Sequence, residues 1–157
     1  MQFAIFPSIF LLVFTSVVLI FISRYDNKTM LINPLMILLI AIYGIIFFAI
    51  NTADLLLLIT NIFIMCFIFV IPLFFGLGLG DFLLVISMCL FFTEEIFIKV
   101  YLVCFIISAF IWTIYQIDKY NLWHNKKEML KMKFPFAPPI SIGFICFVVY
   151  YILINLL

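Results

Sequence analysis

The stretch from Asn61 to Phe92 decides how the rest of the chain is interpreted. It reads NIFIMCFIFVIPLFF (61–75), GLGLGD (76–81) and FLLVISMCLFF (82–92), so a glycine-rich segment ending in Asp81 separates two uncharged apolar runs. Such runs are typical of membrane helices, and a carboxylate between them is a candidate functional residue because charge is costly at that depth. Alternate glycines let a backbone leave helical geometry and let another segment come close.

Composition places the whole chain in a membrane. Hydrophobic residues make up 69% of the 157 residues, and only 10% are charged. A soluble domain is about half apolar and about a quarter charged, so the surplus apolar surface must face lipid. The net charge of +1 gives no basic patch for a nucleic-acid partner. The length leaves room for a single domain over residues 1–157.

Six apolar runs predict an all-α membrane domain with about six transmembrane helices, because a span needs roughly 20 apolar residues. The fourth run is shorter, so we expect it to begin inside the membrane near Asp81, or the glycine segment to dip into the bilayer. Irregular backbone at that depth is tolerated where protein or a water-filled cavity surrounds it. The runs are Phe3–Ser23, Pro34–Ile50, Leu55–Phe75, Phe82–Phe92, Ile96–Tyr115 and Ile140–Leu157.

Basic residues predict the orientation of these spans. Alternating spans place the loops at about 24–33, 76–81 and 116–139 on one side, and the first and third of these loops hold seven of the eight basic residues. The positive-inside rule makes that side cytoplasmic. The eighth basic residue, Lys99, follows Glu95 by four residues. This spacing favours an ion pair on one face of a helix, near the outer end of the fifth span.

Two carboxylates, Asp26 and Asp81, lie on the predicted cytoplasmic edge of spans. Two such groups in a partly dry site tend to share one proton. The ionised member can deprotonate a water while the protonated one donates to a carbonyl oxygen, as in aspartic peptidases. From spacing alone an alternative stays open, in which Asp26 is an ordinary loop residue and Asp81 is the N-cap of the fourth span. The other acidic residues are expected to be solvated or locally paired (Asp54, Glu94, Glu95, Asp118 and Glu128).

The cysteines and the single histidine form no metal-binding pattern. The four cysteines lie in apolar runs without CxxC spacing, so we expect them to be packing residues. His124 belongs to the polar segment 118–133, whose lysines we expect to contact anionic lipid headgroups. The sequence therefore predicts no metal and no cofactor.

Three segments, in order along the chain, resemble motifs of the prepilin peptidases, which are polytopic aspartic peptidases of the GxGD type. The first resembles the family's aspartate followed by a basic stretch and Ile-Pro-Asn, the second is the GxGD signature, and the third is similar to a proline-aromatic motif opening the last span. In this sequence they read Asp26-Asn27-Lys28-Thr29-Met30-Leu31-Ile32-Asn33-Pro34, then Gly78-Leu79-Gly80-Asp81, then Phe134-Pro135-Phe136-Ala137-Pro138 with Ile142-Gly143.

The resemblance implies a membrane aspartic endopeptidase that cleaves the leader peptide of type IV prepilin-like proteins. It places a multi-pass protein in the cell inner membrane, with its active site toward the cytoplasm and prepilin-like substrates and the lipid bilayer as partners. The scissile bond would follow a glycine that precedes an apolar helix. The implied catalytic residues are Asp26 and Asp81, and the implied substrate-binding residues are Gly78, Gly80, Pro135, Phe136 and Pro138.

The chain departs from the family's pattern at several positions. Asn33-Pro34 reverses the usual Pro-Asn order, Leu83 stands where a lysine is often found, and Ala137 stands where a glycine is common. The chain also lacks the cytoplasmic cysteine-rich domain of long members. It therefore resembles the short, peptidase-only form, associated with small pilins of the tight-adherence type and without N-methyltransferase activity.

Three other functions remain open. Tyr25-Asp26 and the Gly-Leu-Gly-Asp at 78–81 also resemble motifs of the presenilin and signal-peptide-peptidase group. That group differs from this chain because it has more spans, carries its aspartates on consecutive helices and uses a Pro-Ala-Leu motif that is absent here. A small transporter could use Asp26 and Asp81 to bind a cation or relay protons. An inactive assembly factor could have kept the fold without the activity.

Overall fold

The computed structural model describes residues 5–29, 31–51, 54–74, 78–119 and 135–156, and this part of the chain is all α-helical. The all-α prediction is confirmed, and six α-helices with one short 3-10 helix (η2) make up the fold within these ranges. The elements are α1 (Ile5–Thr29), α2 (Pro34–Ile50), α3 (Leu55–Phe74), α4 (Leu79–Met88), η2 (Cys89–Phe91), α5 (Glu95–Lys119) and α7 (Ala137–Leu156).

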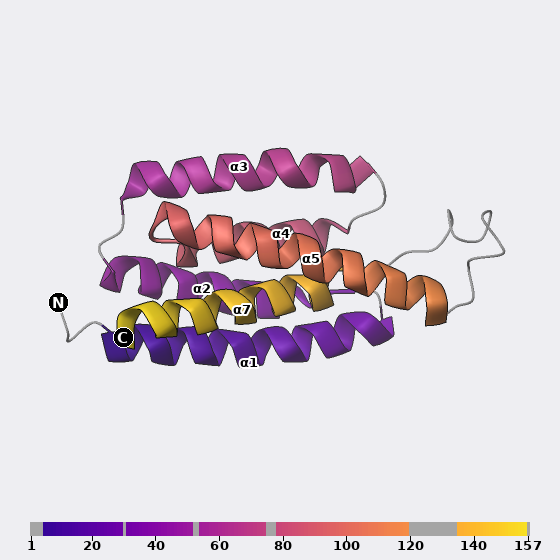
Figure 1. Cartoon of the computed structure of the whole chain (residues 1–157), viewed down its shortest axis with the longest axis horizontal. Helices are drawn as coiled ribbons and strands as arrows, with labels where there is room; N and C mark the ends of the chain where they lie inside the picture. Colours follow the sequence, from indigo (N-terminus) through magenta and orange to yellow (C-terminus); the bar gives the residue numbers. More distant parts are fainter. Residues whose placement is uncertain (1–4, 30, 52–53, 75–77, 120–134, 157) are drawn as a thin grey trace.

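The helices lie side by side with their long axes roughly aligned (Figure 1). Helix α7 packs against both α1 and α5, and α2 packs against α1, α4 and η2. Helix α3 lies at one edge of the bundle, where it contacts α4 and η2. Successive helices alternate in direction, so the C-terminal end of α1 lies at the same end of the bundle as the N-terminal ends of α4 and α7.

Three of the described helices are long and apolar enough to cross a membrane, namely α1, α5 and α7. This identifies a membrane protein. Helix α2 has 17 residues, a length of about 25 Å at about 1.5 Å per residue, slightly less than a hydrocarbon core of about 30 Å. Helix α4 has 10 residues and η2 has 3, so this pair is too short to cross alone, as the sequence predicts for the fourth run.

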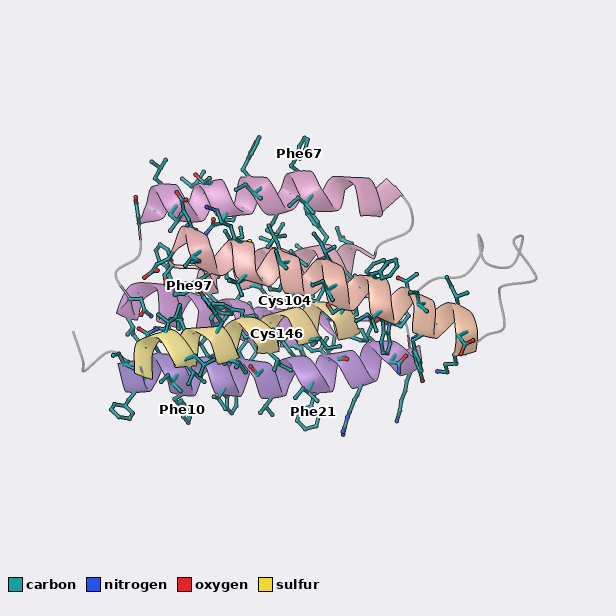
Figure 2. All side chains as sticks on the ribbon, viewed as in Figure 1. Phe10, Phe21, Phe67, Phe97, Cys104 and Cys146 are labelled. Atoms are coloured by element: carbon teal, nitrogen blue, oxygen red, sulfur yellow. The ribbon has the colours of Figure 1, made fainter. Side chains whose placement is uncertain are left out.

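The surface of the bundle is apolar, as lipid contact requires. Phe10 and Phe21 on α1 and Phe67 on α3 point away from the bundle (Figure 2) and are largely exposed. Between the helices, aromatic rings from several elements fill the core, with neighbouring ring centroids 4.9–5.4 Å apart in the closest contacts. The exposed rings have no counterpart in a water-soluble domain of this size, since large exposed apolar patches mark contact with another apolar phase.

The helices extend further than the predicted loops allow. Helix α1 continues through Thr29, α4 begins at Leu79, α5 continues to Lys119 and α7 begins at Ala137. The predicted loops at about 24–33, 76–81 and 116–139 therefore overlap helix ends, because hydropathy marks where apolar composition ends and polar residues can continue a helix. The limit at 33 agrees with the start of α2 at Pro34. Residues 76–77 and 120–134, with Gly76 and His124, lie outside the described residues.

The reversed Asn33-Pro34 pair is a helix start. The Asn33 side chain accepts a hydrogen bond from the Leu35 N–H at 2.9 Å, and Pro34 occupies the first position of α2. Asparagine is a favoured N-cap, and proline suits the first helical turn because its missing N–H is not needed there. The departure from the family's order thus has a local structural reason.

Close packing holds α7 against its two neighbours. A Cβ on Gly143 would lie 3.1 Å from the Phe105 Cα, so glycine lets α7 approach α5 closely. The Ser141 hydroxyl donates to the Leu19 carbonyl of α1 at 3.0 Å. These contacts fix the N-terminal end of α7 beside the end of α1 that carries Asp26.

Candidate active site

Asp81 lies in the first turn of α4, where its side chain bonds back to the helix start. Gly78 is the N-cap, and its backbone N–H donates to Asp81 Oδ2 at 3.2 Å. The alternative that Asp81 is itself the N-cap is wrong, since it is the third helical residue. A carboxylate in this position is favoured by the positive end of the helix dipole. The side chain is 8% exposed, and within the described residues Oδ1 has no hydrogen-bond partner.

Asp26 lies in the last turn of α1 and is 3% exposed. Its Oδ2 accepts a hydrogen bond at 3.2 Å from the backbone N–H of Ala137, the first residue of α7. The first N–H groups of a helix have no partner within the helix, so this carboxylate satisfies one of them. The alternative that Asp26 is an ordinary loop residue is therefore wrong.

The two carboxylates lie close enough for their negative charges to interact. They come from α1 and α4, which are separated along the chain by α2 and α3. A Cβ on Gly80 would lie 3.2 Å from Ile32 Cβ, so the segment after Asp26 also touches the segment before Asp81. The bundle thus brings all three motif segments to one end: Asp26 with Ile32, Gly78 to Asp81, and Ala137.

The two motif glycines are required by close approach and not by an unusual backbone conformation. Gly78 has an ordinary extended conformation, and Gly80 lies within α4. A Cβ added to Gly78 would lie 3.1 Å from Asp81 Oδ2, and one added to Gly80 would press on Ile32. The sequence suggested a flexible glycine loop, whereas Gly78 and Gly80 belong to the start of α4, where Gly80 packs on Ile32.

The proline-aromatic segment forms the beginning of α7. Pro135 is buried, and its carbonyl accepts a hydrogen bond from the Trp112 indole N–H of α5 at 3.0 Å. The Phe136 carbonyl accepts from the Ile140 N–H, and the Pro138 side chain is buried. These residues place the Ala137 N–H against Asp26. That Pro135, Phe136 and Pro138 also bind substrate stays a prediction.

Sequence reasoning missed three participants at this end of the bundle. The Ala137 N–H is a backbone group, so its role cannot be inferred from the type of residue. Trp112 could have been noted as an indole donor in an apolar span, since a buried tryptophan N–H needs an acceptor. Gln116, also on α5, is 1% exposed, and neither of its amide atoms has a hydrogen-bond partner among the residues that the structure describes. A glutamine inside an apolar run is a signal that could have identified it.

A cavity of about 260 Å³ flanks the site between α1 and α2. It lies one turn from Asp26, because Ile22 and Tyr25 line it from α1, and Asn33 lines it from the start of α2. Apart from Tyr25 and Asn33, the side chains that line the cavity are apolar, so the cavity could receive an apolar side chain from a bound segment. The lining residues are Phe21, Ile22, Tyr25, Asn33 and Met36.

Among the described residues, no group of three or more histidine, cysteine, aspartate or glutamate side chains could hold a metal ion. The two aspartates instead form a pair of buried acids. Two interacting carboxyl groups lose their protons as a coupled pair. Comparisons with protein-family models, curated proteins and solved structures find no match for the chain.

Proposed function

We propose that this protein is a membrane aspartic endopeptidase that removes the leader of type IV prepilin-like proteins at the cytoplasmic face of the inner membrane. One observation carries the proposal. Asp26 and Asp81, from helices distant in sequence, lie buried at the same end of the bundle with interacting charges. Each is also held by a backbone N–H at 3.2 Å, so each carboxyl group has a fixed orientation.

The proposed chemistry uses the pair as acid and base. The ionised carboxylate takes a proton from a water molecule, whose oxygen attacks the carbonyl carbon of the scissile peptide, while the protonated carboxyl donates to the carbonyl oxygen. The tetrahedral intermediate then breaks the C–N bond, and a proton passes to the leaving amine. The Gly78 N–H occupies Oδ2 of Asp81, and Oδ1 has no partner within the described residues, so we assign this chemistry to Oδ1.

The proposed substrate binds at the edge of the bundle with its apolar helix in the membrane. Gly78 is exposed next to the buried Asp81, so an extended leader could lie against the chain there. The cavity between α1 and α2 could receive an apolar side chain that follows the scissile bond. Both carboxylates are buried, so substrate must displace neighbouring groups to reach them.

The identity of the cleaved bond tests this function. Purified protein would be reconstituted in vesicles with prepilin-like candidates from the same genome, and product masses would be measured. We expect one cut, after the glycine that precedes the apolar helix, and loss of that cut when the substrate glycine is replaced by valine. Cleavage inside the apolar helix would instead support the presenilin-like alternative. No cleavage of any candidate by an inserted, folded protein would count against peptidase function.

A further inference from the structure

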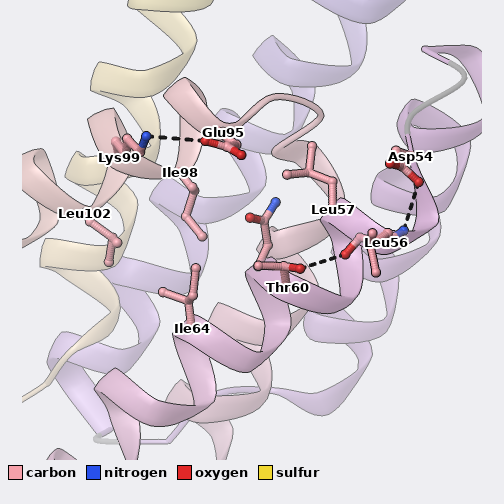
Figure 3. Close-up of a pocket in the computed structure, with 10 residues that line it drawn as sticks. Asp54, Leu56, Leu57, Thr60, Ile64, Glu95, Ile98, Lys99 and Leu102 are labelled. Carbon is pink, nitrogen blue, oxygen red and sulfur yellow. Dashed lines mark hydrogen bonds and ion pairs between the residues drawn. The ribbon is translucent and has the colours of Figure 1, made fainter.

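A second hollow lies at the end of the bundle opposite Asp26 and Asp81. It is a groove of about 370 Å³ between the N-terminal halves of α3 and α5 (Figure 3). Charged side chains surround its mouth, namely Asp54, Glu95 and Lys99. Apolar side chains line its deeper part, including Ile64 and Leu102.

The groove exists because α3 is held away from α5. Helix α3 packs on α4 and η2, and the Asn61 side-chain amide donates to the Phe92 carbonyl at 2.9 Å. This buried hydrogen bond fixes α3 against the segment that precedes α5. The space between the two helices is therefore a built feature of the packing.

The polarity of the groove matches one leaflet of a bilayer. From Asp54 to Ile64 there are ten residues, a rise of about 15 Å along a helix. Half of a hydrocarbon core of about 30 Å has the same depth. The charged mouth would then lie at headgroup level, and Ile64 and Leu102 would lie near the bilayer centre. A molecule with a polar head and an apolar chain fits this gradient.

The charged side chains at the mouth of the groove determine which lipid headgroup binds best. Lys99 Nζ lies 3.4 Å from Glu95 Oε2, and both side chains are more than 70% exposed, so they can also meet a ligand. Asp54 accepts a hydrogen bond from the Leu56 N–H and has no basic partner among the described residues. Two carboxylates and one ammonium leave one uncompensated negative charge. The mouth therefore favours a headgroup that carries both an ammonium and a phosphate over one that is only anionic.

We propose that this groove binds an amine-bearing phospholipid, phosphatidylethanolamine, as a structural ligand. Its ammonium is attracted by the carboxylates of the mouth, its phosphate contacts Lys99, and one acyl chain lies between α3 and α5. The inference rests on insertion of the helices in a membrane and does not depend on peptidase activity. The bound lipid fills the space that the helices leave and stabilises the attachment of α3.

Native mass spectrometry of the intact protein tests the proposal. The protein, purified in mild detergent, would be mixed with equal amounts of phosphatidylethanolamine and phosphatidylglycerol of the same chain length. We expect at least a fivefold preference for the ethanolamine lipid. Combining Asp54→Asn with Glu95→Gln should bring that preference below twofold, and glycerophosphoethanolamine, which has no acyl chains, should not bind.

Two tryptophan variants separate the groove from the general lipid surface. Leu102→Trp fills the groove and should lower the bound fraction at least tenfold, whereas Val103→Trp adds the same ring at the next, exposed position and should leave it unchanged. Equal binding by the two variants, or no headgroup preference, would overturn the proposal. Asp81→Asn should keep full lipid binding, so failure of the peptidase proposal would leave this result unaffected.

Discussion

The Asp26 carboxylate accepts a hydrogen bond at 3.2 Å from the backbone N–H of Ala137, which lies 111 residues further along the chain. The contact joins the last turn of α1 to the first residue of α7. Because Asp26 is nearly fully buried, a hydrogen bond to its carboxylate offsets part of the cost of removing that group from water. The geometry of the candidate site therefore depends on where α7 begins.

Replacing Ala137 by proline should remove this hydrogen bond while keeping a residue that suits the first helical position. We expect about a tenfold or larger loss of prepilin cleavage, since a hydrogen bond to a charged group contributes about 1.5–3 kcal/mol. Ala137→Ser is the matched control, because it adds side-chain bulk and keeps the N–H. Equal cleavage rates for the two variants in vesicles would contradict a role for this contact.

Gly78→Val should abolish cleavage and leave the protein inserted in the membrane. A Cβ at this position would lie 3.1 Å from Asp81 Oδ2, so the branched side chain would displace the carboxylate. Loss of a group engaged in acid–base catalysis typically lowers rates by about 10²–10⁴-fold. Leu79→Val places the same side chain at the next, exposed position and should cleave normally. Unchanged cleavage by Gly78→Val would show that the packing around Asp81 is not required.

Gly80→Ala should lower stability and cleavage, and Ile32→Gly should restore part of both. The added Cβ would lie 3.2 Å from Ile32 Cβ, and overpacking of this kind costs about 1–3 kcal/mol. Glycine at position 32 removes the Cβ that the added group would meet, so we expect a coupling free energy of about 0.5–3 kcal/mol between the two sites. Thermal unfolding in detergent of the wild type, both single variants and the double variant measures it. Simple additivity would mean that Gly80 and Ile32 are not in contact.

Asn33→Ala should destabilise the protein by about 1 kcal/mol through loss of the N-cap of α2, whereas Asn33→Asp should retain most of the stability. The Asn33 side chain accepts the Leu35 N–H at 2.9 Å, and aspartate offers an oxygen in the same place. Unfolding free energies in a lipid-like detergent distinguish the two variants. If the alanine and aspartate variants unfold alike, the cap contributes nothing and the reversed Asn33-Pro34 order needs another explanation.

Much of the fold could be predicted from the sequence because membrane helices are encoded by composition. The apolar runs predicted the α-helical bundle, and the salt bridge of Lys99 with Glu95 at 3.4 Å is confirmed. The helix ends could not be predicted, since a residue such as Thr29 continues α1 although it is polar. Its hydroxyl donates to the Tyr25 carbonyl at 2.9 Å, a bond that hydropathy does not report.

The candidate site was predictable in its side chains and unpredictable in its backbone contacts. Asp26 and Asp81 stand out as carboxylates at the edges of apolar runs, and the structure brings their charges together. The Ala137 N–H, which holds Asp26, follows from the packing of α7 between α1 and α5. The role of the glycines also depends on tertiary contacts, because their neighbours, Asp81 Oδ2 and Ile32, are known only once α4 is placed.

The central claim is that Asp26 and Asp81 act together in peptide cleavage. Its most direct test is single-turnover cleavage of a prepilin-like substrate in vesicles by the wild type, Asp26→Asn and Asp81→Asn, with membrane insertion verified for each. Asparagine keeps the shape of the side chain and an acceptor oxygen but cannot take up or release the proton. The wild type should release mature product with the leader removed, and neither variant should release any. Mature product from either aspartate variant would contradict the account.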